Sequence, residues 1–597
     1  MPRIRIRHIL VCTVLVLWIF FFLPQDEAFS FLRRTSSRHG TQALAQYMND
    51  RNDVPNITTT KSSFDWSSVK FKYPPPRTPE LPAPFTDRPR IQARFRSDSK
   101  GVAATQQRRR REVKKAFGKS WASYKKQAWM KDALKPISGE FVDQFSGWAA
   151  TLVDSLDTLW MMGLKDDFYE AVQAVATIDF GKSTASSVNM FETCIRYLGG
   201  LIAAYDLSGH EVLKNKAIEV GDLLYAGFNT ENGMPVDFIS FEKAKTGEGL
   251  VVEKSVVSAS PGTITLEFSR LSQITGDDKY YAAVSRVMDV FHEGQNKTRL
   301  PGMWPMYVAM ANKNVTSGYQ FTIGGNADSL YEYLPKAFAL LGSADASSKK
   351  YEDMARFFMD TAIDSLFFRP MIPEEYDILI SGNCDVLAGG PRLDPESEHL
   401  SCFIGGLYAL GGRLFNSDKY LDIGKRLARG CAYAYDSMPT GIMPERYNMA
   451  MCPGADRLKS CPWNESYFEE EARKRIEYKP HLPKGFTTAK DARYILRPEA
   501  IESVFILWRI TGDPWWRETA WNMFEAVMKT TETEYANAAV LDVTVLGAKK
   551  EDYMESFWMA ETLKYFYLCF ADADLVSLDE FVLNTEAHPF RLAKGAR

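Results

Sequence analysis

Acidic residues embedded in apolar or aromatic segments are the groups of this chain whose types could do chemistry. They are Glu192, Asp328, Glu499, Glu502, Glu555 and Glu561. Glycoside hydrolysis needs such groups, because one carboxyl must stay protonated as the acid while another stays ionised as the base. Structural roles remain open for each. Glu192 and Arg196 form an i,i+4 pair, Asp328 could cap a helix, and Glu499 could belong to an ordinary first helical turn.

Other catalytic classes lack their motifs in this chain. The seven histidines are scattered, without an H-E-x-x-H sequence or a Cys/His zinc spacing, and there is no G-x-S-x-G sequence. The segment 181–183 (Gly-Lys-Ser) lacks the upstream glycine of a phosphate-binding loop, since Ala176 stands there. Lys and Arg (72) nearly balance Asp and Glu (75), and the net charge of −3 excludes an overall basic field for nucleic acid.

Helices must position these acids, because apolar residues recur at i, i+3, i+4 and i+7 from about Arg109 onward. Helical runs stop in short Gly-containing turns at residues 208–210, 275–277, 342–344, 411–412 and 511–513. Gly209, Gly276 and Gly342 are 67 and 66 residues apart, which leaves room for two helices in each interval. Repeated helical hairpins form either an open solenoid or a closed toroid. We expect an all-α toroid whose inner helices surround an acidic cavity, with strands confined to loops such as 251–257.

The N-terminal segment indicates the compartment. Arg3, Arg5 and Arg7 precede an uncharged run at residues 9–23, which Pro24 closes. The run is short for a full membrane span, but no small-residue cleavage site follows it, which favours an uncleaved anchor over a cleaved signal. Basic residues before the run place the N-terminus in the cytosol. We therefore predict a cytosolic tail (1–8), a signal-anchor (9–23), a Pro/Ser-rich lumenal stalk (24–107) and a catalytic domain (108–597).

Sequons and cysteines agree with a lumenal protein. Acceptor Asn-X-Ser/Thr tripeptides begin at Asn56, Asn296, Asn314 and Asn464. Of eight cysteines, Cys12 lies in the anchor, and the odd number left in an oxidising space requires an unpaired thiol or an intermolecular bond. Cys452 and Cys461 flank a loop that they could close, whereas Cys194 and Cys569 lie in apolar helical patterns typical of buried thiols. The pairing of Cys384 stays open.

Eight ordered segments resemble glycoside hydrolase family 47, the class I α-1,2-mannosidases that trim high-mannose N-glycans in the secretory pathway. They are residues 153–160, 191–196, 262–276, 328–334, 399–403, 496–503, 554–565 and 584–589. Together they extend over nearly the whole folded region. The resemblance implies an (α/α)7 barrel and an inverting hydrolysis of terminal α-1,2-linked mannose.

The resemblance also implies roles for three acids. Glu192 matches the general acid of the family, thought to act through a water, and Asp328 matches the other candidate acid. Glu499 matches the base that activates water. Inversion requires an acid and a base about 6.5–9.5 Å apart, so that this water fits between them.

The cofactor implied by the resemblance is Ca²⁺. Thr585 matches the one residue that binds the ion directly, through its hydroxyl and carbonyl oxygens. Waters complete the shell, held by the acids that match Glu499, Glu502, Glu561 and Glu586. Oxygen-only ligation suits Ca²⁺.

The sugar pocket is the last part of the site that the resemblance implies. Phe557 matches the aromatic residue on which the terminal mannose stacks, and Arg196, His399 and Arg497 match polar positions around it. Asn326 departs from the family pattern, in which enzymes that remove mostly one mannose in the endoplasmic reticulum carry Arg and Golgi-type enzymes often carry Leu. Because Asn cannot make the bidentate contacts of Arg, we expect a looser, Golgi-like branch preference.

A cysteine pair and one glutamate matter further for the family comparison. Cys402 and Cys431 match the disulfide pair of the family, which would tie two helices and stabilise the fold by about 2–4 kcal/mol. Glu398 replaces the Asp often found before the matched histidine.

Several activities are compatible with these motifs. We favour a processing α-1,2-mannosidase, because all three catalytic carboxylates are present. The alternatives are a degradation-associated mannose-trimming protein of the same family, a non-catalytic mannose-binding lectin on the same barrel, and a different helical-toroid hydrolase such as a glucosidase. We expect a monomeric, single-pass type II protein of the Golgi or endoplasmic reticulum membrane that acts on high-mannose N-glycans of glycoproteins and binds no nucleic acid.

Overall fold

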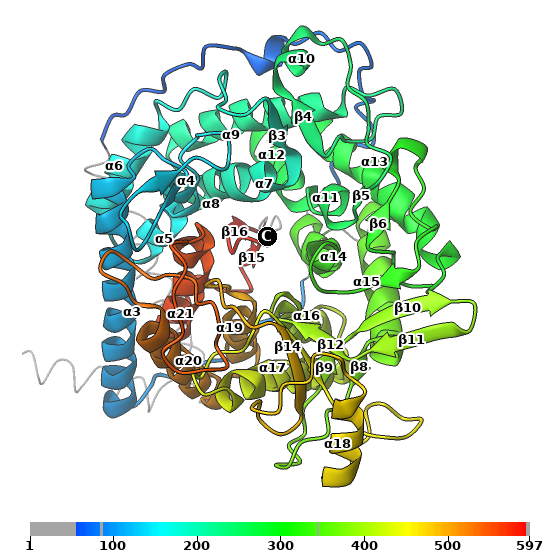
Figure 1. The fold of residues 1–597 in the computed structure, drawn as a ribbon. Helices are drawn as coiled ribbons and strands as arrows, with labels where there is room; N and C mark the ends of the chain where they lie inside the picture. Colours follow the sequence, from blue (N-terminus) through cyan, green and yellow to red (C-terminus); the bar gives the residue numbers. More distant parts are fainter. Residues whose placement is uncertain (1–54, 84–87, 343–345, 593–597) are drawn as a thin grey trace, which may run out of the picture. The chain divides into compact units, whose positions relative to one another are not determined.

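A computed structural model describes residues 55–83, 88–342 and 346–592 (Figure 1). The described residues from Ile57 onward belong to one compact unit. The predicted cytosolic tail (1–8) and signal-anchor (9–23) lie outside the described residues. Within the described part, no helix combines the length and the apolar character needed to cross a membrane.

Seven pairs of helices, each with one inner and one outer member, build the unit as an (α/α)7 barrel, and the predicted toroid is confirmed. Figure 1 shows an inner and an outer ring of helices around the hairpin β15–β16. The inner helices are α5 (Leu156–Met161), α8 (Gly199–Ser208), α12 (Thr265–Thr275), α14 (Asp328–Leu341), α16 (Phe403–Leu414), α19 (Glu499–Thr511) and α21 (Leu563–Phe570). Their outer partners, in the same order, are α6 (Lys165–Val175), α9 (Glu211–Tyr225), α13 (Lys279–Gly294), α15 (Ala346–Ser365), α17 (Asp418–Ser437), α20 (Trp515–Thr531) and α3 (Lys100–Gln127).

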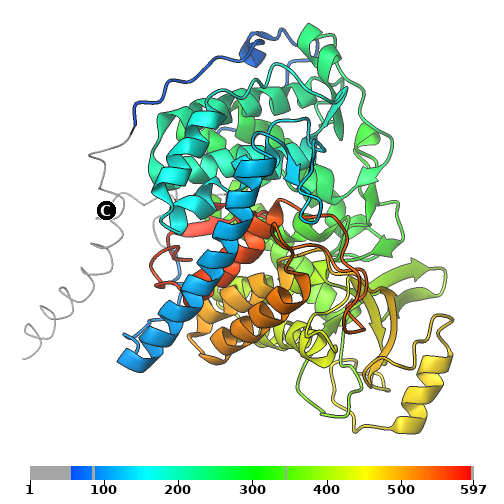
Figure 2. The ribbon, with the colours of Figure 1, turned by 60° about the vertical axis from the view of Figure 1, so that its left-hand side comes forward.

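Closure of the barrel joins the two ends of the compact unit. The first long helix, α3, packs on the outside of the last inner helix, α21 (Figure 2). The remaining helical segments are η2 (Trp66–Ser68), α4 (Ala150–Asp154), α7 (Met190–Glu192), η3 (Thr193–Leu198), η4 (Ala226–Phe228), α10 (Phe241–Thr246), α11 (Ala259–Gly262), η5 (Gln295–Lys297), η6 (Met310–Asn312), η7 (Leu400–Cys402), α18 (Glu465–Arg473) and η8 (Trp558–Thr562). Contact of η8 with α5 completes the inner ring.

Glycines end most inner helices, as predicted. Gly209, Gly276, Gly342 and Gly512 each follow an inner helix in the left-handed conformation, with φ between 56° and 73°, where a residue without a Cβ carries no steric cost. The predicted stop at residues 411–412 is wrong, since α16 continues through both glycines to Leu414. A Cβ on Gly412 would lie 2.8 Å from the backbone nitrogen of Leu421, so this glycine permits the close packing of α16 on α17.

Strands are short and confined to connections, as expected. The two-stranded sheets, all antiparallel, pair β1 (Ala133–Leu134) with β2 (Phe141–Val142), β3 (Ser187–Asn189) with β4 (Phe238–Ser240), β5 (Val256–Val257) with β6 (Tyr307–Val308), β8 (Phe367–Phe368) with β9 (Ile380–Ser381), and β15 (Phe581–Leu583) with β16 (Pro589–Arg591). Two three-stranded sheets have the orders β11 (Gly390–Asp394), β10 (Asn383–Leu387), β7 (Gln320–Phe321) and β12 (Glu396–Glu398), β13 (Arg446–Met449), β14 (Phe486–Asp491). In β15–β16, Leu583 pairs with Pro589, which fixes the turn at residues 584–588.

The segment before α3 packs against the barrel, and the compact unit therefore begins about fifty residues before the predicted boundary at 108. Trp66 is 3% exposed and its Nε1 donates to the carbonyl of Phe180 at 2.9 Å. The backbone nitrogen of Ile91 donates to Asp579 Oδ1 at 2.7 Å. Isolated apolar residues in a Pro- and Ser-rich segment show no helical or strand period, so the pattern could not predict this packing.

Two disulfides occur in the described residues. Cys402 and Cys431 are joined, as are Cys452 and Cys461, while Cys194, Cys384 and Cys569 are buried free thiols. The first disulfide ties the end of η7 to the middle of α17.

Candidate active site

Glu192, Asp328 and Asn326 line one open cavity of about 610 Å³. Glu192 comes from α7, whereas Asn326 and Asp328 come from the loop before α14 and from its first residue, so two separate chain segments contribute to the cavity. Lining residues that the sequence analysis did not propose for the site are Asp237, Ser260, Glu398, Arg446 and Phe238. The last of these is 49% exposed at the edge of the cavity.

Glu192 is placed by a cap and followed by a π-helix. The side chain of Asn189 accepts from the backbone nitrogen of Glu192 at 2.9 Å, which starts α7. The chain then widens into the π-helix η3, a geometry that is rare and frequent at functional sites. In η3, Arg196 Nε donates to Glu192 Oε2 at 2.8 Å. The guanidinium of Arg196 also forms an ion pair with Glu586 and lies 3.5 Å from Asp154 Oδ2.

Asp328 begins α14 behind a backbone in an unusual conformation. Asn326 has φ 77°, a region that Asn tolerates better than most side chains. The backbone nitrogen of Gly325 donates to Glu398 Oε2 at 2.9 Å, so Glu398 holds the loop that presents Asp328. Burial raises the pKa of Asp328 to about 7, and the charges of Glu332, Glu499 and Glu398 act in the same direction. Asp328 therefore retains its proton close to neutral pH.

Glu499 is the first residue of α19, where the positive end of the helix dipole favours a carboxylate. Its Oε2 lies 2.8 Å from His399 Nδ1, and its Oε1 lies 3.6 Å from the guanidinium of Arg497. Burial alone would raise the pKa of Glu499, but the hydrogen bond with His399 and the charge of Arg497 outweigh it and lower the pKa. Glu499 is therefore ionised at neutral pH, in contrast to Asp328.

The histidine and the arginine beside Glu499 are themselves held in place. His399 Nε2 lies 2.7 Å from the hydroxyl of Tyr435, and Arg497 Nε donates to Glu445 Oε2 at 2.6 Å. Neither Tyr435 nor Glu445 is predicted from the sequence, because each lies in a distant segment without a recognisable pattern. A left-handed residue, Leu496 (φ 71°), precedes Arg497, a strained conformation of the kind that clusters at functional sites.

Phe557 lies between the two arginines of the site. Its ring centroid is 6.0 Å from the guanidinium carbon of Arg196 and 5.8 Å from that of Arg497. Only 6% of the residue is exposed. Both guanidinium groups thus lie near the ring, with Arg196 paired with Glu192 and Arg497 3.6 Å from Glu499.

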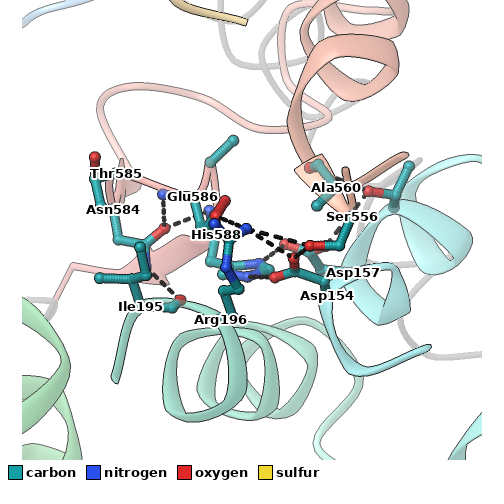
Figure 3. A network of polar contacts seen from close by, with 12 residues as sticks. Asp154, Asp157, Ile195, Arg196, Ser556, Ala560, Asn584, Thr585, Glu586 and His588 are labelled. Atoms are coloured by element: carbon teal, nitrogen blue, oxygen red, sulfur yellow. Dashed lines mark hydrogen bonds and ion pairs between the residues drawn. The ribbon is translucent and has the colours of Figure 1, made fainter. Parts of the chain in front are cut away.

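The turn that carries Thr585 is fixed by a polar network at the hairpin β15–β16 (Figure 3). Asn584 Oδ1 accepts from the backbone nitrogens of Glu586 and His588, at 2.9 and 2.8 Å. The ring nitrogens of His588 lie 2.9 Å from Asp157 Oδ2 and 3.0 Å from Asp154 Oδ1. Burial alone would lower the pKa of His588, but these two carboxylates raise it. The network anchors the turn to α4 and α5.

Three further predicted acids are buried at this turn: Glu586 belongs to it, and Glu502 and Glu561 lie close to it. Burial raises the pKa of Glu586 to about 7 and that of Glu502 to about 8, and it raises the pKa of Glu561 well above its ordinary value. The charges of Glu586, Glu499 and Glu502 add to the shift of Glu561. The Lys336 ammonium, 3.4 Å from Glu502 Oε1, compensates only part of this negative charge.

The acidic cluster fits a cation site of the expected kind. Glu586 Oε2 is buried without a hydrogen-bond partner in the described chain, and Thr585 is the partly accessible residue of a turn whose other residues are buried. Among the described residues, no three His, Cys, Asp or Glu side chains are grouped to hold a metal ion directly. Oxygen donors and uncompensated negative charge suit Ca²⁺.

Known proteins are similar to this chain over most of its length. The model of glycosyl hydrolase family 47 matches residues 116–592. A mannosyl-oligosaccharide 1,2-α-mannosidase of Arabidopsis thaliana is 36% identical over 489 residues, which cover 81% of this chain and 79% of that protein. An endoplasmic reticulum mannosyl-oligosaccharide 1,2-α-mannosidase of Rattus norvegicus is 34% identical, over 81% of this chain and 68% of that protein. The structure of an α-1,2-mannosidase from Trichoderma reesei matches with a TM-score of 0.72 and 30% identity, over 81% of this chain and 99% of that one.

Proposed function

The chain belongs to glycosyl hydrolase family 47, and we propose that it removes terminal α-1,2-linked mannose from high-mannose N-glycans during N-glycan processing. The observation that carries the proposal is the contrast between two carboxyl groups of the site. Asp328 retains a proton close to neutral pH, while Glu499 is ionised. Such a pair supplies the acid and the base of an inverting glycosidase.

Hydrolysis follows from these two protonation states. Asp328 donates its proton to the glycosidic oxygen as the bond from C1 to that oxygen breaks. Glu499 removes a proton from a water molecule whose oxygen forms the new bond to C1 from the opposite face, so the anomeric configuration inverts. Glu192, on the wall of the same cavity, is the alternative proton donor and would act through a water.

Phe557 and the residues around it recognise the sugar in this proposal. We assign the terminal mannose to the face of this ring, with Arg196, His399 and Arg497 as the surrounding polar groups. Asn326, exposed on the cavity wall, is the residue to which we assign branch preference. Its short uncharged side chain favours removal of several mannoses rather than one.

The cofactor we propose is Ca²⁺, held directly by Thr585 and through waters by Glu499, Glu502, Glu561 and Glu586. Bound at the turn, the ion supplies positive charge and oxygen coordination that orient the hydroxyl groups of the mannose. The buried, mutually repelling carboxyl groups support this assignment.

The enzyme acts in the secretory pathway, and we propose a type II membrane protein of the Golgi or endoplasmic reticulum. In this proposal residues 9–23 anchor the chain, residues 1–8 face the cytosol, and a monomeric catalytic domain faces the lumen. The charge pattern of the N-terminus supports this orientation.

One experiment tests the activity and the cofactor together. The full chain is incubated with a high-mannose N-glycan in Ca²⁺ or in EDTA, and mass spectrometry counts the hexoses that are lost, with Glu499→Gln as the inactive control. We expect loss of α-1,2-linked mannose in Ca²⁺ only. Glycan binding without hexose loss under any condition would refute the hydrolase and leave a lectin.

A further inference from the structure

An open groove of about 640 Å³ lies on the outside of the barrel, between the outer helices α17 and α20. We call it the outer groove; its walls are residues 429–436 of α17, residues 515–526 of α20 and the loop 376–378. It shares no lining residue with the cavity of Glu192 and Asp328. One of its lining residues, Tyr435, faces the Glu499 site, since its hydroxyl lies 2.7 Å from His399 Nε2.

The walls of the outer groove are regular helix faces. Arg429, Tyr433 and Asp436 are spaced at i, i+4 and i+7 on α17, and Trp515, Thr519 and Asn522 have the same spacing on α20. Small residues keep the floor open: a Cβ placed on Gly441 would lie 2.8 Å from the Cβ of Ala526. The groove is therefore a consequence of the sequence on both helices.

Aromatic side chains are exposed at its rim. Tyr376 is 57% exposed and Trp515 is 42% exposed. The rings of Tyr376 and Tyr433 meet edge to face, with centroids 6.2 Å apart, and the guanidinium carbon of Arg429 lies 5.5 Å from the ring of Trp515. Exposed aromatic faces offer flat apolar surfaces on which the C–H faces of sugar rings can stack.

Polar groups of both signs stand beside these rings. Asp377 is paired with Arg426 at 2.9 Å, and Asp436 and Arg429 both line the groove. The balance of charges provides no field that would select a phosphate or a cation. Donors and acceptors placed side by side, including Asn522, match hydroxyl groups, each of which both donates and accepts.

We propose that the outer groove binds a neutral oligosaccharide and is a second glycan site of this protein. Its volume lies in the range of about 300–1,000 Å³ that is common for small-ligand sites. The identity of the natural ligand, a mannose-rich N-glycan, rests on the proposed function. Its source is either the glycoprotein substrate or an N-glycan carried by this chain at one of its own sequons.

The proposal is tested by the NMR signal of the Trp515 side chain. The full chain is labelled with 5-fluorotryptophan, and its ¹⁹F resonances are recorded while a branched mannopentaose with only α-1,3 and α-1,6 linkages is added. The Trp515 resonance is assigned by its absence in Trp515→Phe. Because the probe lacks α-1,2 linkages and the readout needs no hydrolysis, the result is independent of whether the proposed activity is present.

We expect a saturable shift of the Trp515 resonance. Tyr376→Ala should weaken the apparent affinity by about tenfold, a typical result of removing an aromatic contact from a binding surface. The matched control is Phe357→Ala, which removes an exposed aromatic residue of the outer helix α15 and should leave the affinity unchanged. Unchanged resonances of the other tryptophans show that each variant is folded.

Treatment with an endoglycosidase distinguishes the two sources. A shift seen without treatment indicates a groove open to glycans of other molecules, whereas a shift that requires treatment indicates a groove occupied by a glycan of the chain itself. Both results support an oligosaccharide site. A Trp515 resonance that does not move before or after treatment, or an affinity that Tyr376→Ala leaves unchanged, would overturn the proposal.

Discussion

Protonation of the buried acids near Thr585 makes the stability of the cation-free protein depend on pH. Burial raises the pKa of Glu586 to about 7, against an ordinary 4.5. Between these two pH values the unfolded chain has already released the proton that the folded chain still holds, so a rising pH favours the unfolded state. The stability contributed by Glu586 is complete below pH 4.5 and is lost as the pH rises through about 7.

The size of this effect can be worked out for Glu586, which is only 2% exposed. The difference between about 7 and 4.5, at about 1.36 kcal/mol per pKa unit, corresponds to about 3 kcal/mol. A bound Ca²⁺ favours the ionised carboxylates and opposes this loss. We therefore expect removal of the cation to destabilise the protein more at pH 8 than at pH 5.

Urea unfolding at pH 5 and pH 8, in Ca²⁺ and in EDTA, measures the effect as a free energy of unfolding. In EDTA the free energy of unfolding should fall between pH 5 and pH 8, and in Glu586→Gln this fall should be about 2–3 kcal/mol smaller than in the wild type. Comparing pH intervals cancels only the pH-independent cost of the substitution, because the attraction of Arg196 acts on the ionised carboxylate and is already included in the pKa of Glu586. Glu525→Gln, at an exposed acid of α20, is the control and should behave as the wild type. Equal pH dependence in Glu586→Gln and the wild type would refute the reasoning.

Three further predictions concern the base and the disulfide. Glu499→Gln should lower kcat by about 10²–10⁴ with little change in KM, because it removes the base but keeps the shape of the site. Tyr435→Phe removes the hydroxyl that lies 2.7 Å from His399 Nε2, and it should lower kcat by about two- to tenfold at unchanged KM, the kinetic equivalent of one neutral hydrogen bond. Replacing both Cys402 and Cys431 by Ala should lower the free energy of unfolding by about 3–4 kcal/mol, from the 29-residue separation that the disulfide spans.

Each of these predictions has a result that would contradict it. Kinetics with an α-1,2-linked mannobiose would count against the first if Glu499→Gln kept more than a tenth of the wild-type kcat, and against the second if Tyr435→Phe raised KM and left kcat unchanged. Urea unfolding under non-reducing conditions would contradict the third if the double alanine variant were as stable as the wild type. Circular dichroism of each variant serves as the folding control.

Periodicity and glycine positions in the sequence predicted paired helices, whereas the closed toroid was inferred from the embedded acids and its seven-fold count from the resemblance to the family. Paired helices were predicted by the i, i+3, i+4, i+7 pattern and by the intervals between Gly209, Gly276 and Gly342. An inner helix must bury an apolar surface, and the chain must then reverse its direction at the glycine that ends the helix. The predicted helix end at residues 411–412 was wrong because these glycines serve helix packing. A glycine needed for close helix packing is indistinguishable in sequence from a glycine that ends a helix.

Local motifs likewise identified the acids of the site but not their protonation. Asp328 and Glu499 both stand at a helix start, and nothing in either segment distinguishes a carboxyl that retains its proton from one that is ionised. That difference arises from His399 and Arg497 around one group and from burial among other acids around the other. These neighbours come from separate parts of the chain, so only the folded structure brings them together.

The sequence by itself therefore determined the paired helices and the segments that carry the acids, whereas the residues proposed to hold a cation came from the resemblance to the family. Three features appear only in the tertiary structure. Tyr435 contacts His399, which in turn contacts Glu499; the segment before α3 packs on the barrel; and the outer groove lies between α17 and α20. The physical reason is the distance along the sequence between the residues that determine each feature. Helix periodicity and turns depend on residues a few positions apart, whereas pKa shifts and grooves depend on side chains that meet only after the chain has folded.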